Sequence, residues 1–138
     1  MTPSILPGRF QHISKKRLLL VDADECFGAS LKDALAQVHY EVDWEKDHQA
    51  AVERARTISY SLVLIDDHVT GIPLPALIRD ILQPHKPPVI IFGTAVIASE
   101  QEDCVAAGAT GFISKCTNDL ASLLIKIIAI TATVHAPN

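Results

Sequence analysis

The chain has 138 residues, of which 49% are hydrophobic, so it is long and apolar enough to form one domain with its own buried core. Its formal net charge is −4 at pH 7, and its basic cluster at residues 15–17 only precedes the first apolar run. Nucleic-acid-binding domains present an extended basic surface. We therefore expect no direct contact with nucleic acid.

The apolar segments do not indicate a membrane protein. Residues 120–134 are the most apolar stretch, but they include Lys126 and are fewer than the roughly 20 residues that span a bilayer. The first residues contain Pro3, Pro7 and Arg9 and lack the continuous apolar stretch of a secretory signal. We therefore expect a cytoplasmic location without a membrane contact.

Strand and helix patterns alternate along the chain. Residues 1–15 contain Pro, Gly, Ser and His without periodicity, which indicates a flexible lead-in. Runs of Val, Ile and Leu predict strands at 17–21, 40–44, 61–65, 88–92 and 111–114, and helical spacing predicts helices at 26–38, 47–57, 74–82, 99–107 and 117–132. This alternation favours one α/β domain at residues 16–132, with a five-stranded parallel, doubly wound sheet, and a tail at 133–138.

Local signals predict where two of the helices begin, where one of them ends, and which face of the first helix packs on the sheet. Ser99 and Glu102 have the spacing of a capping box, and Gly108 stands where a left-handed residue would end the same helix. The Thr-Asn-Asp sequence at 117–119 can cap the last helix. The face of the first helix that packs on the sheet is predicted to consist of Leu31, Ala34, Leu35 and Val38.

The last predicted helix is apolar nearly all round. One apolar stripe consists of Leu120, Leu123, Leu124, Ile127 and Ile128, and a second consists of Ala121, Ile125 and Ala129. A helix with two apolar stripes needs a cover on more than one side. We expect a protein partner or a second copy of the chain, as in a homodimer, to cover the second stripe. The alternative is that the tail from Thr131 onward folds back over it.

Acidic residues follow two of the predicted strands. Residues 62–65 are apolar and lead into Asp66 and Asp67, and residues 18–21 lead into Asp22 and Asp24. The carboxyl ends of parallel strands lie at the same edge of a sheet, where open α/β sheets bind their ligands. The sequence therefore predicts an acidic pocket at this edge.

The order of these elements and several short motifs resemble the receiver domain of bacterial response regulators, over about residues 16–131. The matching segments are Val21-Asp22, 62–66 with Gly71 five residues later, 88–91, 107–109, and 111–115, which ends in Lys115. The resemblance implies a flavodoxin-like three-layer α/β/α sandwich. The portion from 111 to 134 is most similar to receivers that precede a helix-turn-helix transcriptional domain.

The resemblance also implies a reaction. In this family an aspartate at the end of the third strand, here Asp66, takes a phosphoryl group from a phosphohistidine of a histidine kinase or phosphotransfer protein. Asp67 is a rival for this role, although the distance to Gly71 favours Asp66. Mg²⁺ would be held by Asp22, Asp66 and the main-chain carbonyl of His68, and Lys115 would bind the phosphoryl anion.

The sequence departs from the family pattern at four positions. The second acid after the first strand is replaced by Ala23, which weakens the Mg²⁺ site unless Asp24 turns inward. The hydroxyl residue that ends the fourth strand is replaced by Gly93, so Thr94 would have to serve. Cys116 follows Lys115 in place of proline, and Thr70 replaces the proline before Gly71.

These departures leave two regulatory functions open: a phosphorylated receiver, and a pseudo-receiver that binds partners or dimerises without phosphate. Two other functions fit less of the sequence. The Asp66-x-His68-x-x-Gly71 pattern also occurs in cobalamin-binding domains, but the other motifs of those domains are missing. A metal-dependent hydrolase would use Asp22, Asp24 and Asp66. We expect that the chain is not an enzyme.

Overall fold

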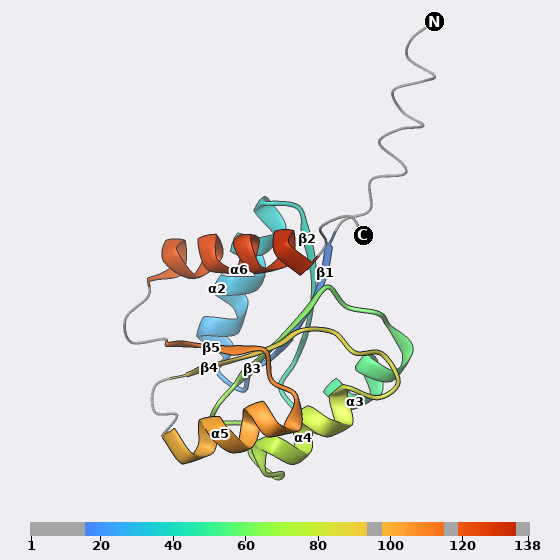
Figure 1. The fold of residues 1–138 in the computed structure, drawn as a ribbon. Coiled ribbons are helices and arrows are strands. Elements are labelled where there is room, and N and C mark those ends of the chain that lie inside the picture. The colour runs from blue at the N-terminus through green and yellow to red at the C-terminus, as the bar shows by residue number, and fades with distance from the viewer. Residues whose placement is uncertain (1–15, 94–97, 115–118, 135–138) are drawn as a thin grey trace, which may run out of the picture.

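The computed structural model describes residues 16–93, 98–114 and 119–134, which form one five-stranded sheet with helices on both faces (Figure 1). The strands lie in the order β2-β1-β3-β4-β5, and every neighbouring pair is parallel. This arrangement confirms the predicted doubly wound α/β fold. The elements in chain order are β1 (Lys16–Val21), α2 (Glu25–Gln37), β2 (Tyr40–Glu45), α3 (His48–Thr57), β3 (Leu62–Asp66), α4 (Leu74–Ile81), β4 (Val89–Gly93), α5 (Ala98–Ala107), β5 (Gly111–Ser114) and α6 (Leu120–Val134).

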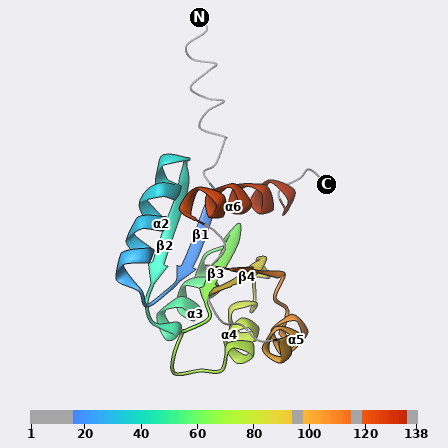
Figure 2. The same ribbon diagram turned by 90° about the vertical axis from the view of Figure 1, so that its left-hand side faces the viewer.

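The sheet is covered by two layers of helices (Figures 1 and 2). Helices α2 and α6 lie on one face, and α3, α4 and α5 lie on the other. Alternate residues of each central strand face opposite layers: Leu18 and Leu20 pack toward α2 and α6, whereas Leu19 and Val21 pack toward the other three helices. Both faces of the sheet are therefore buried, which explains why these strands are continuous apolar runs in the sequence.

The helix ends follow most of the local signals. Gly108 has a φ of +119° and ends α5, and the Asp119 carboxylate accepts a 2.8 Å hydrogen bond from the backbone N–H of Ser122 at the start of α6. Two predictions are wrong. Ser99 is the second residue of α5 rather than its cap, because the helix begins at Ala98. Val38 is 39% exposed because it lies just past the last turn of α2, where it no longer faces the sheet.

Helix α6 packs on the sheet along one stripe only. Leu123 and Ile127 of the first predicted stripe are buried, but Ile128, predicted on the same stripe, is 40% exposed; Ile125 of the second stripe is 67% exposed. The chain stays helical to Val134, so the expectation that the tail from Thr131 folds back over the second stripe is wrong for residues 131–134. A partner over that stripe remains a prediction. Within the described ranges, no helix combines the length and the apolar content needed to cross a membrane.

Candidate functional site

Two buried carboxylates lie at the carboxyl ends of neighbouring central strands. Asp22 directly follows β1 and is fully buried, and Asp66 is the last residue of β3 and is 4% exposed. Val21 pairs with Ile65 in the register of β1 and β3, so Asp22 and Asp66 follow side by side on strands about 4.8 Å apart. The strand order reverses its direction of growth between β1 and β3, and ligands bind at this point in open α/β sheets. The structure thus brings Asp22 and Asp66 together as the sequence predicted.

The loop after β1 is fixed by contacts on both sides of Asp22. The carboxylate of Asp22 accepts a 2.9 Å hydrogen bond from the backbone N–H of Asp24, and its main-chain carbonyl accepts a 2.8 Å bond from the indole Nε1 of Trp44 on β2. The ring of Trp44 lies against α2, where a Cβ at Gly28 would stand 2.3 Å from the ring. Trp44 therefore holds the loop that carries Asp22.

Asp24 does not turn inward as a substitute metal ligand would have to. Its side chain is exposed, and its Oδ1 accepts a 3.1 Å hydrogen bond from the backbone N–H of Phe27. Asp24 is thus the N-cap of α2, a position where a carboxylate satisfies an N–H group that has no partner within the helix. This capping role corrects the expectation that Asp24 replaces the acid missing at Ala23.

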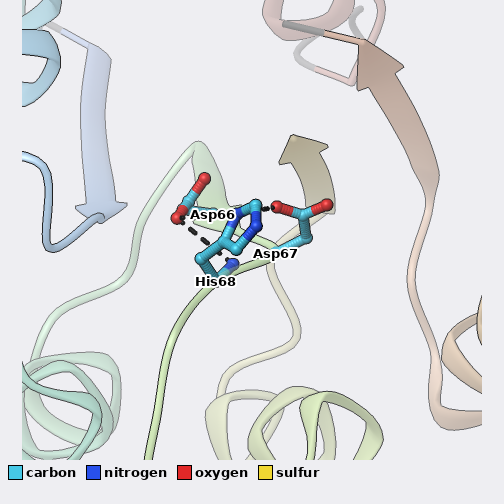
Figure 3. A group of neighbouring side chains, drawn as sticks. All are labelled: Asp66, Asp67 and His68. Carbon is cyan, nitrogen blue, oxygen red and sulfur yellow. Dashed lines mark hydrogen bonds and ion pairs between the residues drawn. The ribbon is translucent and has the colours of Figure 1, made fainter. Parts of the chain in front are cut away.

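Asp66, Asp67 and His68 form a group of potential metal ligands (Figure 3). One ligand atom from each residue lies within 4.8 Å of the others. The Nδ1 of His68 is 2.7 Å from Oδ1 of Asp67, and the backbone N–H of His68 donates a 3.2 Å hydrogen bond to Oδ2 of Asp66. The sequence pointed only to the main-chain carbonyl of His68, so the nearby imidazole is an addition that the structure makes.

Asp67 points toward the end of β4. Its backbone N–H donates a 3.0 Å hydrogen bond to the carbonyl of Phe92, and its side chain is only 7% exposed. A Cβ at Gly93 would stand 2.0 Å from Cγ of Asp67 and little farther from both carboxylate oxygens. The carboxylate of Asp67 therefore fills the space that a side chain at position 93 would need.

The loop after β3 turns at Gly71. This residue has a φ of +91°, a left-handed conformation that favours glycine, and a Cβ there would stand 2.9 Å from Nε2 of His48. The conformation of the loop thus explains why a glycine stands five residues after Asp66. The loop carries the chain from the end of β3 to α4, which begins at Leu74 with Pro75 in its first turn.

Two expected site residues are not placed. Thr94 and Lys115 directly follow β4 and β5 in the sequence and lie outside the described residues. The expectations about their hydroxyl and ammonium groups therefore remain predictions.

The donor set fits a divalent cation. Mg²⁺ prefers carboxylate and carbonyl oxygens in near-octahedral geometry. Asp66 supplies carboxylate oxygens here, and the buried carboxylate of Asp22 lies at the end of the neighbouring strand. Asp67 lies beside them and adds negative charge. Because like charges repel strongly in a partly buried site, a cation among these carboxylates would offset their repulsion.

The chain matches a known family model and several solved structures. A family model described as response regulator receiver domain matches residues 18–134. The search of curated proteins found no match. Among solved structures, the non-phosphorylated HemR receiver domain from Leptospira biflexa is 29% identical, with a TM-score of 0.77 over 86% of this chain and 95% of that one.

Two further solved structures share the fold. The CheY-like receiver domain protein from Methanospirillum hungatei JF-1 is 24% identical, with a TM-score of 0.79 over 88% of this chain and 97% of that one. A response regulator protein from Burkholderia pseudomallei, solved with a phosphorylated aspartic acid, a calcium ion and citrate, is 21% identical, with a TM-score of 0.72 over 88% of this chain and 71% of that one.

Proposed function

The chain belongs to the response regulator receiver domain family of two-component systems, and from that premise we propose that Asp66 accepts a phosphoryl group and that the resulting charge switches protein contacts. The observation that carries this proposal is the position of Asp66, a nearly buried carboxylate at the end of β3 and beside Asp22 at the end of β1. The phosphorylated aspartate in the Burkholderia pseudomallei response regulator supports the same chemistry.

The phosphoryl donor would be a phosphohistidine on a histidine kinase or phosphotransfer protein. A carboxylate oxygen of Asp66 attacks the phosphorus atom, and the imidazole of the donor leaves. Asp22, Asp66 and the main-chain carbonyl of His68 would hold Mg²⁺, which neutralises charge on the carboxylate and phosphoryl oxygens when bound. Trp44 holds the loop that presents Asp22. Lys115 and Thr94 would contact the phosphoryl oxygens.

The output would be a change in protein contacts. A phosphorylated Asp66 carries a charge of about −1.5 to −2 in place of the single negative charge of the carboxylate, and this change shifts the balance between conformations of the α/β loops at this edge. The exposed apolar side chains of α6, among them Ile125 and Ile128, form the surface we assign to homodimer formation. We expect no direct contact with nucleic acid and no enzymatic turnover. Similarity of residues 111–134 to receivers of helix-turn-helix regulators suggests a role in transcription regulation within the cytoplasm.

One observation favours a second candidate function. Ala23 removes one acid from the pocket, and the buried carboxylate of Asp67 occupies the space at Gly93 where the family has a hydroxyl side chain. Both changes are expected to weaken phosphoryl binding. The alternative is therefore a divergent pseudo-receiver whose surface binds partners, or a second copy, without phosphate.

Trp44 offers a direct test of the first function. It is the one tryptophan of the chain, and its indole is hydrogen-bonded to the carbonyl of Asp22. Addition of Mg²⁺ and then beryllofluoride, a phosphoryl mimic, should change the fluorescence of Trp44 in the wild type. The change on beryllofluoride should be absent in Asp66→Ala and present in Asp33→Ala, which removes an exposed acid on α2.

Sedimentation of the same samples separates the two functions. A beryllofluoride-dependent change in size supports the switch. If the wild type responds to neither Mg²⁺ nor beryllofluoride and sediments as a dimer that Ile125→Glu disrupts, the pseudo-receiver is the better description.

A further inference from the structure

The carboxylate of Asp67 lies on the β4 side of the pocket, where it is well placed to oppose an incoming anion. It is 7% exposed, and one of its oxygens lies within 4.8 Å of an oxygen of Asp66. Gly93 has no side chain, and the carboxylate of Asp67 fills the space that a side chain at this position would occupy. No side chain can occupy position 93 unless Asp67 moves.

The neighbours of Asp67 hold this position from two directions. Its backbone N–H is bonded to the carbonyl of Phe92 on β4, and its Oδ1 lies 2.7 Å from Nδ1 of His68. The imidazole of His68 is 65% exposed, so water screens its contribution.

From this geometry we infer that Asp67 is a specificity-determining residue, which opposes phosphoryl acceptance at Asp66 and shifts the pocket toward cations. The inference rests on the proposed function, because it concerns the rate of the same reaction. A carboxylate can accept hydrogen bonds but, when ionised, cannot donate one to a phosphoryl oxygen. It therefore replaces an attractive contact with a repulsive one on the β4 side of the pocket.

The reaction with acetyl phosphate isolates this effect from any protein donor. A carboxylate oxygen of Asp66 forms a new bond to phosphorus while the bond from phosphorus to the acetyl oxygen breaks, and acetate leaves with the electron pair. The carboxylate carries no proton, so none has to be removed. The phosphoryl group approaches with negative charge, and a like charge about 5 Å away in a partly buried site is enough to slow transfer about tenfold.

The test compares the initial rate of phosphoryl adduct formation, by intact mass, in acetyl phosphate and Mg²⁺. Asp67→Asn keeps the shape of the side chain and removes its charge, so we expect a rate about tenfold above that of the wild type. Asp67→Ser, a smaller neutral residue, should show the same direction if the Asn variant folds poorly. Asp33→Asn, on the exposed face of α2, is the charge-matched control and should not change the rate.

Three outcomes would overturn the inference, and they separate it from the proposed function. Equal rates in wild type and both Asp67 variants leave Asp66 as the acceptor but remove the role of Asp67. An adduct that is lost in Asp67→Asn and kept in Asp66→Asn makes Asp67 the acceptor. Absence of an adduct in every variant contradicts the inference and the proposed phosphoryl transfer together.

Discussion

Replacement of Gly93 by alanine tests whether Asp67 occupies the space at the end of β4. The new Cβ would stand 2.0 Å from Cγ of Asp67, about half of a normal carbon–carbon contact, and the carboxylate that must move is almost buried. Overpacking of this kind costs about 1–3 kcal/mol, so we expect a loss of about 2 kcal/mol. With a urea m-value of about 2 kcal/mol/M, the midpoint of unfolding would fall by about 1 M.

The partner variant is Asp67→Ala, which deletes all three atoms that the new Cβ would meet. Alone, it should change stability by only about 0–1 kcal/mol, because its His68 partner is largely exposed. The double variant, with alanine at both positions, should therefore unfold at a higher urea concentration than Gly93→Ala. The gain in the double variant measures the coupling between the two positions.

Gly111→Ala is the matched control. It is the same substitution in the neighbouring strand β5, but its Cβ would meet only Cδ1 of Ile90 at 3.4 Å. Its free energy of unfolding should stay within about 0.5 kcal/mol of the wild-type value. The reasoning is refuted if Gly93→Ala unfolds together with Gly111→Ala, or if Asp67→Ala fails to restore stability to Gly93→Ala.

Three further predictions concern hydrogen bonds that stabilise the fold. Trp44→Phe removes the indole donor to the carbonyl of Asp22 and should weaken Mg²⁺ binding several-fold in a calorimetric titration. It should also lower the free energy of unfolding by about 1 kcal/mol. Asp119→Ala removes the cap of α6 and should lower the urea concentration at the midpoint of unfolding, whereas Asp119→Asn should lower it less. Burial raises the pKa of Asp43, but hydrogen bonds from Tyr60 and Arg17, together with the charge of Arg54, outweigh it and hold the pKa below its usual 3.8. Because the folded-state pKa is the lower one, this stabilisation is present above 3.8 and is lost as the pH falls through the folded value, so the acid limb of unfolding should be flatter in Asp43→Asn.

Sequence patterns predicted the fold because the strands are buried on both faces. Runs such as 18–21 and 62–65 are apolar without interruption, and their alternation with helices leaves few topologies. The meeting of Asp22 and Asp66 followed from that topology alone, since both residues end parallel neighbouring strands.

Side-chain direction in the loops could not be predicted in the same way. Asp24 could turn toward the pocket or cap α2, and the structure shows that the N-terminus of the helix holds it. The approach of the Asp67 carboxylate to Gly93 brings together a residue that follows β3 and the last residue of β4, so no local pattern contains it. The available signal was Gly93 itself, because a glycine at the end of a bulky apolar strand indicates close approach of another group.

The central claim is that Asp66 is the phosphoryl acceptor, and peptide mapping after treatment with acetyl phosphate and Mg²⁺ tests it most directly. Reduction with borohydride marks the acyl phosphate, so the modified residue can be assigned by mass. We predict the mark on Asp66, and no mark in Asp66→Asn. A mark on Asp67 alone, or an unmodified chain even in the Asp67→Asn variant, would contradict the account.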